Sequence, residues 1–460
     1  MKILQRVCLC SLIWLAGCAS TGIVKPPEIA RGKSATAPGS GASDLSRNAA
    51  ASPGNELLPI TATLAASGAV AALAPPADLW ERIRRGYAMP DLDNQLVHDR
   101  ELWYSSRNDY ILRMAERSRK YLFHIVEELE RRNMPTELAL LPFIESAFNP
   151  QAVSSAKAAG MWQFMPATGK TYELKQNAFR DDRRDVLAST RAALDYLQKL
   201  YGMFGDWQLA LAAYNWGEGS VARAIAKNQR AGLGTSYSEL NMPMETRFYV
   251  PKLQAVKNIV SQPAAFNSTL PQIENHPYFQ PVDIKRDIDV ALAAKLAEVP
   301  LEDFKALNPS ANRPVILAAG TPQILLPWDN AEIFQRNLEA YSGGRLASWT
   351  VWLAPTTMRP ADAAKRVGMT EQALRSINNI PPRVVIKAGS SLLVARASHL
   401  ETDVAAHLAD NGQLSLATLA APKRAPPKGR KTAPAARGKA AAKAPVNRGK
   451  AAKPAPPVKR

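Results

Sequence analysis

Apolar residues recur every three or four positions over most of residues 76–270, which is the spacing of amphipathic helices. The clearest run begins at Tyr110 and should end before Pro135, because proline cannot continue a helix. Thr136 is expected to cap the next helix, and Pro142 should kink or interrupt it. The pattern therefore predicts a mainly α-helical first domain.

Two further helices are predicted in the same domain. Asp185 precedes an apolar run at 186–200, and Asp206 precedes another at 207–214. Aspartate is a favoured N-cap because its carboxylate accepts a hydrogen bond from a free backbone N–H. Ordered sequence is expected to begin near Asp78. The 460 residues, 46% of them hydrophobic, allow two or more domains with sizeable cores.

A weak repeat follows the helical domain. Residues 291–308 align without gaps with residues 361–378, an offset of seventy, and each copy predicts two helices ending in an asparagine. A β-rich run comes after each copy and a shorter one before it. The expected strands are 280–282 and 324–327 in the first copy, and 350–352 and 392–394 in the second. We therefore expect two small α+β units, at 277–330 and 345–398.

Both ends of the chain differ from this ordered middle. Residues 18–75 are rich in Ala, Ser, Gly and Pro and predict a flexible tether. Residues 401–460 predict a disordered tail, in which thirteen Lys or Arg and no acid follow Asn411. Those thirteen charges are most of the formal net charge of +18, so the tail should seek an anionic surface or an acidic protein partner. A merely solvated tail is the alternative.

The first residues indicate export. A basic start and a short apolar core at 7–16 predict a signal peptide over 1–17, too short for a stable membrane span. Leu15-Ala16-Gly17-Cys18 resembles a bacterial lipobox, whose Cys18 would be acylated and become the mature N-terminus. Ala19 in the next position implies, by the same resemblance, the periplasmic face of the outer membrane. An ordinary secretory signal is the alternative.

Cysteine and histidine counts narrow the chemistry. Cys8 and Cys10 lie in the signal peptide, so the mature chain would keep only the lipid-bearing cysteine. That excludes a disulfide framework and a Cys-based metal site, and five histidines show no ligand cluster. We expect no metal and no cofactor. Nucleic acid is not an expected partner, because export conflicts with it and no aromatic residue interleaves the charges of the tail.

Glu145 is the candidate catalytic residue. It follows the apolar run 140–144, and desolvation by such neighbours favours the protonated carboxyl that a general acid needs. Downstream, 160–166 supplies amide, thioether and aromatic groups suited to sugar rings. The next acid is Glu173, whereas glycoside cleavage commonly uses two nearby carboxylates. The plain alternative is that Glu145 is the first solvent-facing residue of an amphipathic helix.

Four ordered motifs favour the catalytic interpretation of Glu145 over the structural one. They are Glu145-Ser146, Gly160-Met161-Trp162-Gln163-Phe164-Met165-Pro166, Ala212-Ala213-Tyr214-Asn215-Trp216-Gly217 and Glu245-Thr246-Arg247-Phe248-Tyr249-Val250. Together they resemble the signature of the lytic murein transglycosylases, which have a goose-type lysozyme fold, and in particular the membrane-bound type D family. Trp162 departs from the Met or other apolar residue that is usual there.

The resemblance implies cleavage of the β-1,4 bond between N-acetylmuramic acid and N-acetylglucosamine in peptidoglycan glycan strands. Glu145 would act first as acid and then as base, and the muramoyl O6 would attack its own C1 to leave a 1,6-anhydro end. It also implies substrate contacts from Ser154, Gln163, Met165, Tyr214, Asn215 and Tyr249. Trp162 and Trp216 would either stack on sugars or pack in the core. The repeat resembles degenerate LysM units, either glycan-binding or structural spacers.

Two other functions share these motifs. A muramidase of the same fold would activate water, with Asp181, Asp182 or Asp185 folding in as the second acid. A wall-anchored lipoprotein with a decayed enzyme domain would be non-catalytic, and the intact Glu145 argues against it.

Overall fold

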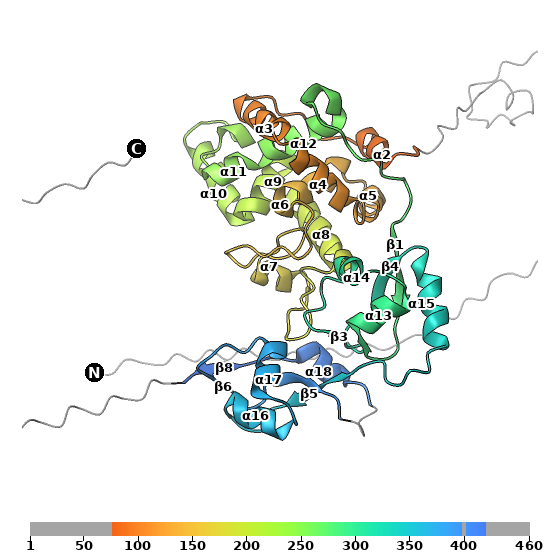
Figure 1. Ribbon diagram of the computed structural model, residues 1–460. Helices are drawn as coiled ribbons and strands as arrows, with labels where there is room; N and C mark the ends of the chain where they lie inside the picture. The colour runs from red at the N-terminus through yellow and green to blue at the C-terminus, as the bar shows by residue number, and fades with distance from the viewer. Residues whose placement is uncertain (1–75, 398–401, 420–460) are drawn as a thin grey trace, which may run out of the picture. The chain divides into compact units, whose positions relative to one another are not determined.

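The computed structural model describes residues 76–397 and 402–419. Cys18, the signal peptide, the tether and the basic segment from residue 420 lie outside these ranges. No helix in the described ranges is both long and apolar enough to cross a membrane. The described chain consists of a helical domain and two small α+β units (Figure 1).

The first domain is built of helices joined by turns and by longer loops (Figure 1). Its elements are α2 (Leu79–Arg85), α3 (Gln95–Ser105), α4 (Asn108–Ser118), α5 (Leu122–Arg131), η1 (Thr136–Leu140), α6 (Leu141–Ser146), α7 (Pro166–Thr171), α8 (Val186–Phe204), α9 (Trp207–Trp216), α10 (Glu218–Arg230), η2 (Tyr237–Glu239), α11 (Met244–Arg247), α12 (Tyr249–Ser261) and η3 (Pro263–Phe266).

Aspartate capping was predicted correctly. Asp185 accepts a hydrogen bond from Ala188 N at the start of α8, and Asp206 accepts one from Leu209 N at the start of α9. Asp78 caps α2 in the same way, where ordered sequence was expected to begin. The helices α8 and α9 run longer than the patterns suggested.

Two predictions about helix ends were wrong. The run from Tyr110 is not one helix, because the chain turns between Ser118 and Tyr121, whose hydroxyl then donates to Ala306 O in the first small unit at 3.0 Å. Thr136 does not cap a helix. It begins the 3-10 turn η1, and its buried hydroxyl donates to Ile83 O at 2.6 Å instead.

Pro142 interrupts the segment before the candidate acid, as expected. The chain changes there from the 3-10 turn η1 to the α-helix α6, with Pro142 in the first turn of the new helix. That position suits proline, whose missing N–H would have no partner there in any helix. A six-residue helix therefore begins just before Glu145.

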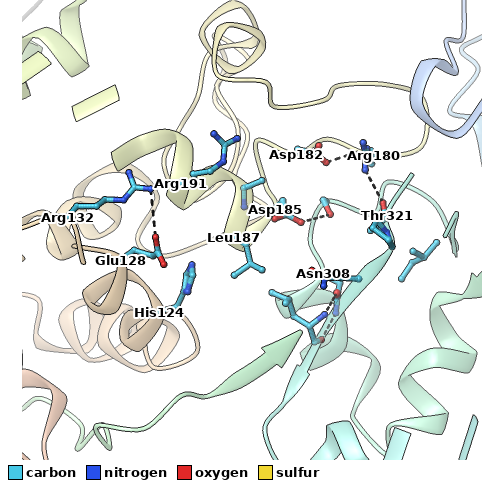
Figure 2. A pocket seen from close by; sticks show the side chains of 17 residues that line it. His124, Glu128, Arg132, Arg180, Asp182, Asp185, Leu187, Arg191, Asn308 and Thr321 are labelled. Carbon is cyan, nitrogen blue, oxygen red and sulfur yellow. Dashed lines mark hydrogen bonds and ion pairs between the residues drawn. The ribbon is translucent and has the colours of Figure 1, made fainter. Parts of the chain in front are cut away.

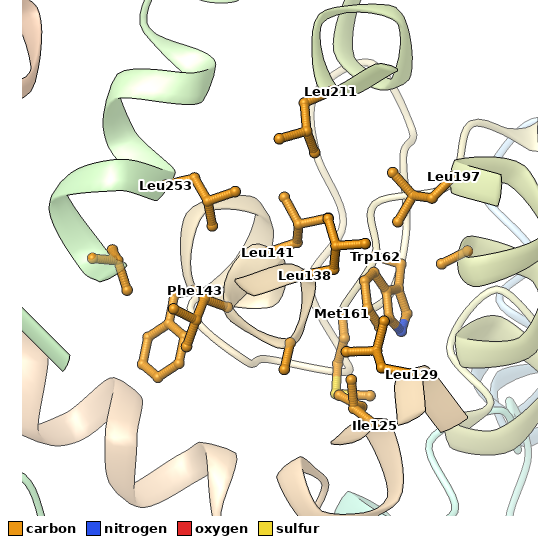
Figure 3. Close-up of a cluster of buried hydrophobic side chains, with 14 of the residues drawn as sticks. Ile125, Leu129, Leu138, Leu141, Phe143, Met161, Trp162, Leu197, Leu211 and Leu253 are labelled. Carbon is orange, nitrogen blue, oxygen red and sulfur yellow. The ribbon is translucent and has the colours of Figure 1, made fainter. Parts of the chain in front are cut away.

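The helical domain has one large hydrophobic core (Figure 3). Leu138 and Leu141 flank the turn from η1 into α6, and the indole of Trp162 lies among the same side chains (Figure 3). The face of α6 opposite Glu145 is therefore fixed by close packing, and a close-packed interior gives a side chain little freedom to shift.

The repeat predicted in the second half is present. Each copy pairs its opening and closing strands antiparallel, with Val282 opposite Ile324 in the first and Val351 opposite Leu393 in the second. The first small unit contains β1 (Phe279–Asp283), β2 (Ile288–Asp289), α13 (Val290–Leu296), α14 (Leu301–Leu307), β3 (Val315–Ile316), β4 (Gln323–Pro327) and α15 (Asn330–Glu339). The second contains β5 (Trp349–Leu353), α16 (Pro360–Arg366), α17 (Glu371–Asn378), β6 (Val384–Ile386), β7 (Ser391–Ala395), α18 (Ala406–Asn411) and β8 (Leu416–Thr418).

The asparagine that ends each helix pair holds the closing strand. Asn308 accepts a hydrogen bond from Leu325 N and donates to Leu325 O, both at 2.8 Å. Asn378 makes the same two bonds with Leu393, at 2.7 and 2.8 Å. The amide side chain thus pairs with the strand as a neighbouring backbone would, which explains why each helix pair ends in this residue type.

Part of the segment that was predicted to be a disordered tail is folded. Residues 402–419 form α18 and β8, in which Ala409 is buried and Leu416 lies opposite Ile386 of β6. The prediction from residue 401 was wrong because this stretch still carries apolar residues, whereas the basic residues begin only at Lys423.

The Asn378 clamp predicts a local loss of stability. Asn378→Ala would leave the buried N–H and C=O of Leu393 without partners, at a cost of roughly 2 to 4 kcal/mol. The amide of Leu393 should then exchange with solvent hydrogen much faster, and the second unit should melt earlier. Asn379→Gly is the matched control, because glycine accepts the left-handed conformation of that exposed neighbour. Equal exchange rates in both variants would contradict the clamp.

Candidate active site

Glu145 lies at the end of a helix that stops abruptly. Leu141 and Phe143 of α6 are buried, whereas Glu145 keeps part of its surface accessible. Immediately after Ser146 the chain turns left-handed, with φ of 52° at Ala147 and 54° at Phe148. Such backbone is uncommon for residues other than glycine and occurs where surrounding packing enforces it. The buried Phe148 ring, edge-on to Phe143 at 4.8 Å, supplies that packing.

The second motif is held by the first and the third. Ser146 Oγ donates to Met161 O at 2.9 Å, and Tyr214 OH donates to Trp162 O at 2.8 Å. Two successive carbonyl groups of the 160–166 loop are therefore bound by side chains from α6 and α9. The loop cannot move without breaking bonds to both helices.

The fourth motif completes a closed circuit. Tyr249, buried at the start of α12, donates its hydroxyl hydrogen to Glu145 Oε1. Thr246 Oγ1 donates to Asn215 Oδ1 at 2.8 Å, which joins the fourth motif to the third. Each of the four sequence motifs is thus bonded to two others. We call this arrangement the motif ring: Glu145-Ser146, the 160–166 loop, Tyr214-Asn215 and Thr246–Tyr249.

Burial sets the ionisation of the candidate acid. Desolvation raises the pKa of Glu145 to about 7, the largest effect on this group. The hydrogen bond from Tyr249 and the charge of Lys252 act in the opposite direction, and the charge of Glu245 adds slightly to the rise. The carboxyl is therefore divided between its protonated and ionised forms near neutral pH.

Gly160 and Gln163 shape the loop beside Glu145. Gly160 has φ of +84°, and a Cβ atom there would come within 2.0 Å of Arg183 O, so only glycine fits. Gln163 also has a positive φ, of 49°, and its Nε2 donates to Gly160 O at 2.8 Å. The amide of Gln163 thus stabilises the turn that presents the loop.

The structure distributes the predicted site residues unequally. Tyr249 contacts Glu145 directly, and Tyr214 is close enough that the negative charge of Glu145 helps to raise its pKa. Ser154 Oγ accepts from Ala158 N at 3.0 Å and so closes a turn, while Met165, within the motif ring, is 44% exposed. Asn215 is engaged by Thr246 rather than by Glu145.

Trp162 is a core residue. Its side chain is fully buried, and Nε1 donates to Thr190 Oγ1 at 3.1 Å (Figure 3). Stacking of Trp162 on a sugar ring, one of its two predicted roles, is therefore wrong. Trp216 packs against the same core but keeps part of its surface accessible.

The aspartates considered as second acids face elsewhere. Figure 2 shows Asp182 and Asp185 in a cavity of 520 Å³ between the helical domain and the first small unit. Asp185 caps α8 and accepts from Ser310 Oγ at 3.3 Å, and burial raises the pKa of Asp182 to about 6. Asp181 pairs with Arg183 at 2.7 Å, and Asp182 pairs with Arg180 at 3.6 Å and accepts from Lys175 N at 3.2 Å. These contacts engage all three aspartates away from Glu145.

Sequence reasoning missed two residues, one that acts on Glu145 and one that fixes the helix carrying its partner Tyr249. Lys252 lies one helical turn after Tyr249 on α12, so the spacing of three residues could have revealed it. Tyr237 donates to Thr246 O at 2.6 Å and accepts from Val250 N at 3.3 Å, which fixes the start of α12. Tyr237 lies outside every motif and carried no sequence signal. In the described parts of the chain, no group of three or more His, Cys, Asp or Glu is placed to hold a metal ion.

Known proteins match both halves of the described chain. Residues 124–233 match the Transglycosylase SLT domain, and residues 278–343 match the Lytic transglycosylase MltD, LysM-like domain. The chain is 34% identical over 339 residues to membrane-bound lytic murein transglycosylase D of Escherichia coli, covering 71% of this chain and 74% of that protein. The chain belongs to the lytic transglycosylases.

Two other relatives match shorter stretches. A protein named for tributyltin chloride resistance in Alteromonas sp. is 49% identical over 113 residues, which cover 24% of this chain and 55% of that protein. The soluble lytic murein transglycosylase of Salmonella typhimurium is 30% identical over 136 residues, covering 28% and 20% respectively. For this lytic transglycosylase, the predicted fold class of a mainly α catalytic domain followed by LysM-like units is confirmed.

The bond from Tyr249 predicts a shifted pH profile. As a general acid Glu145 would have to be protonated for the first step, so activity should fall as pH rises through about 7. In Tyr249→Phe the lost hydrogen bond no longer favours the carboxylate, and the pKa of Glu145 should rise further. The alkaline limb of the profile should move to higher pH, while turnover at pH 7 falls about 10- to 100-fold because the carboxyl is less well placed.

Tyr121→Phe is the matched control for that experiment. Tyr121 is equally buried and also loses a donated hydrogen bond, but to Ala306 O rather than to Glu145. Its pH profile should keep the wild-type shape. A profile that is unmoved in Tyr249→Phe, or moved equally in both variants, would mean that Tyr249 does not tune Glu145.

Proposed function

We propose that this lytic transglycosylase cleaves the β-1,4 bond between N-acetylmuramic acid and N-acetylglucosamine in peptidoglycan, with Glu145 as its only catalytic acid and base. Protonated Glu145 gives its proton to the leaving glycosidic oxygen as the bond from that oxygen to C1 breaks. The resulting carboxylate takes the proton of the muramoyl O6 hydroxyl as O6 bonds to C1. The two steps return Glu145 to its starting form and leave a 1,6-anhydro ring.

The ionisation of Glu145 supports both steps. A group with a pKa near 7 can donate and accept a proton at neutral pH with little cost in either direction. Tyr249 remains hydrogen-bonded to the carboxylate that forms between the steps, and the charge of Lys252 favours the same form. Attack by O6 within the same sugar needs positioning rather than a second nucleophile, and positioning can lower a barrier by several kcal/mol.

The neighbouring acids support a single-carboxylate mechanism. Asp181, Asp182 and Asp185 are engaged by other groups, as described above. Glu245 is the acid whose negative charge helps to raise the pKa of Glu145, and its side chain is exposed on α11. A water-using muramidase would need Glu245 as its general base, and this is the alternative that the product test addresses.

We also propose substrate contacts for other residues that the family resemblance implies. Met165, Gln163 and Asn215 would line the site around Glu145, and Ser154 would contribute from the turn that it closes.

The turns of the first small unit support a scaffolding role for it. Asp181 N donates to Ser310 O, and Asn312 N donates to Phe179 O, both at 2.9 Å, so one turn of the unit is bonded to the helical domain. Buried Asp287, in the other turn, pairs with Arg396 of the second unit at 3.1 Å. We therefore propose that the first LysM-like unit is a structural spacer whose two turns contact neighbouring parts of the chain. Glycan binding through LysM-like turns would then occur in the second unit.

We also propose that acylated Cys18 anchors the protein at the periplasmic face of the outer membrane, with signal peptide 1–17 removed and 18–75 as tether. The name of the Escherichia coli relative includes the word membrane-bound, which supports an envelope location. The anionic surfaces of the envelope would be the partners of the basic segment from residue 420. Deleting 420–460 should then reduce binding to anionic vesicles at low salt, since exposed charges are screened over about a Debye length.

The product distinguishes the two chemistries. Sacculi digested in ¹⁸O-labelled water should yield 1,6-anhydro-muramoyl ends without label, whereas a muramidase would give labelled reducing ends. Glu145→Gln keeps size and packing but has no proton to donate, so turnover should fall by about 10²–10⁴. Glu245→Gln is the matched control and should still give unlabelled anhydro ends. Label in the new ends would overturn the mechanism, and full activity of Glu145→Gln would remove its catalytic residue.

The anchor is tested by membrane fractionation. Cys18→Ala should leave the protein without acyl chains and release it from the outer membrane into the soluble periplasmic fraction. Cys10→Ala changes a cysteine of the signal peptide and should leave fractionation unchanged. Tight membrane association of the Cys18→Ala protein would show that the anchor is not this residue.

A further inference from the structure

An aromatic surface lies at one end of the paired strands β1 and β4 of the first small unit. Trp328 directly follows β4, and His276 and Tyr278 precede β1, so all three lie where these paired strands begin and end. Together with Arg119 of the helical domain and Asp329, they line a cavity of 590 Å³. The turn that carries Asp287 follows the other end of β1.

Trp328 is rigidly held although its side chain is exposed. Its backbone N–H donates to Tyr278 O at 3.0 Å, and its carbonyl accepts from Gln280 Nε2 at 2.9 Å. The edge of His276 meets the indole at 79°, with ring centres 5.4 Å apart. The side chain nevertheless remains 41% exposed. A large aromatic ring kept in place and open to solvent is the usual form of a recognition anchor, because it offers contact area with little loss of side-chain freedom.

Trp103 is another exposed tryptophan, but its surroundings differ from those of Trp328. Trp103 on α3 is similarly exposed, at 37%, but the guanidinium of Arg107 lies 4.4 Å from the centre of its ring. The rings of Tyr104 and Tyr110 meet it edge-on. Trp103 is therefore already partnered within its own domain, whereas Trp328 faces a cavity.

The rim of the cavity is polar. Besides Arg119 and Asp329 it includes Gln272, Glu274 and His276. A flat apolar surface surrounded by hydrogen-bond donors and acceptors matches a pyranose ring, which has an apolar face and a belt of hydroxyl and acetamide groups. An apolar peptide would leave the rim groups unsatisfied, and a lipid surface would meet Glu274 and Asp329 unfavourably.

We propose that the cavity beside Trp328 is a second glycan-binding site, which holds a sugar of the polymeric substrate at a distance from Glu145. The indole stacks on one pyranose ring, and Arg119 and Asp329 bond to its polar groups. The site lies at the opposite end of β1 from the turn that carries Asp287, and Arg119 of the helical domain forms part of its lining. It rests on the proposed function for the identity of the polymer, but it concerns retention of the strand rather than cleavage.

Binding to glycan strands tests the site. In full-length protein carrying Glu145→Gln, to prevent digestion, Trp328→Ala should weaken the Kd for long peptidoglycan strands freed of peptides about three- to tenfold. Trp328→Phe should weaken it less, since a ring remains, and this variant guards against misfolding. Trp103→Ala is the matched control and should bind as the parent does.

Activity separates this site from the catalytic one. With Glu145 intact, Trp328→Ala should raise KM on intact sacculi while turnover of short glycan fragments and the anhydro product stay unchanged. Unchanged Kd in Trp328→Ala, or equal weakening in Trp103→Ala, would overturn the second site and leave the mechanism standing. Weakening only with peptide-bearing strands would also overturn it, because the occupant would then be the peptide. Labelled reducing ends would instead overturn the mechanism and leave the binding result interpretable.

Discussion

The site depends on keeping one carboxyl group poorly solvated without leaving it unpartnered. A carboxylate stripped of water is costly, and a protein can relieve that cost by protonation or by hydrogen bonding. Glu145 uses both, because its pKa lies near 7 and it accepts one bond, from Tyr249. More donors would favour the carboxylate and weaken the acid. The motif ring supplies this single donor and directs the other bonds of the motifs to one another and to the backbone.

A second buried glutamate shows what a different set of partners does. Glu137, on η1 just before α6, accepts from the backbone N–H groups of Ala88 and Met89 and pairs with Lys257 of α12 at 3.1 Å. The same two segments, η1 with α6 and α12, are thus joined at one point by a fully satisfied carboxylate and at another by Glu145 and Tyr249. The Glu137 contacts fix the spacing of the segments, and this spacing lets the Tyr249 hydroxyl reach Glu145.

Sequence patterns predicted correctly the features that depend on residues close together in the chain. The caps at Asp185 and Asp206, the break at Pro142 and the strands of both small units follow from residue types within a few positions of each other. The motifs also identified Glu145 and Tyr249, although not how they meet, because the two residues are 104 positions apart. The helix that includes Tyr110 stops before Tyr121, whose hydroxyl bonds to the first small unit, and the side chain of Trp162 packs in the core. Both outcomes depend on partners that are distant in sequence, which periodicity cannot contain.

The two small units show how one scaffold allows different uses. In both, the asparagine after the helix pair replaces a strand neighbour, so the inner structure is set by one side chain and two backbone groups. Because so few groups set the inner structure, the turns and strand ends can differ between the two units. In the first unit the turns carry Asp287 and Ser310 to partners in adjoining parts of the chain, and the end of β4 carries Trp328. The unit is bonded to the helical domain through the turn at Ser310 and through Tyr121, which donates to Ala306 O, so a ligand bound at Trp328 would be held in place beside the helical domain. For a polymer such as a glycan strand, a fixed position is what allows binding at one point to influence which bond is presented at another.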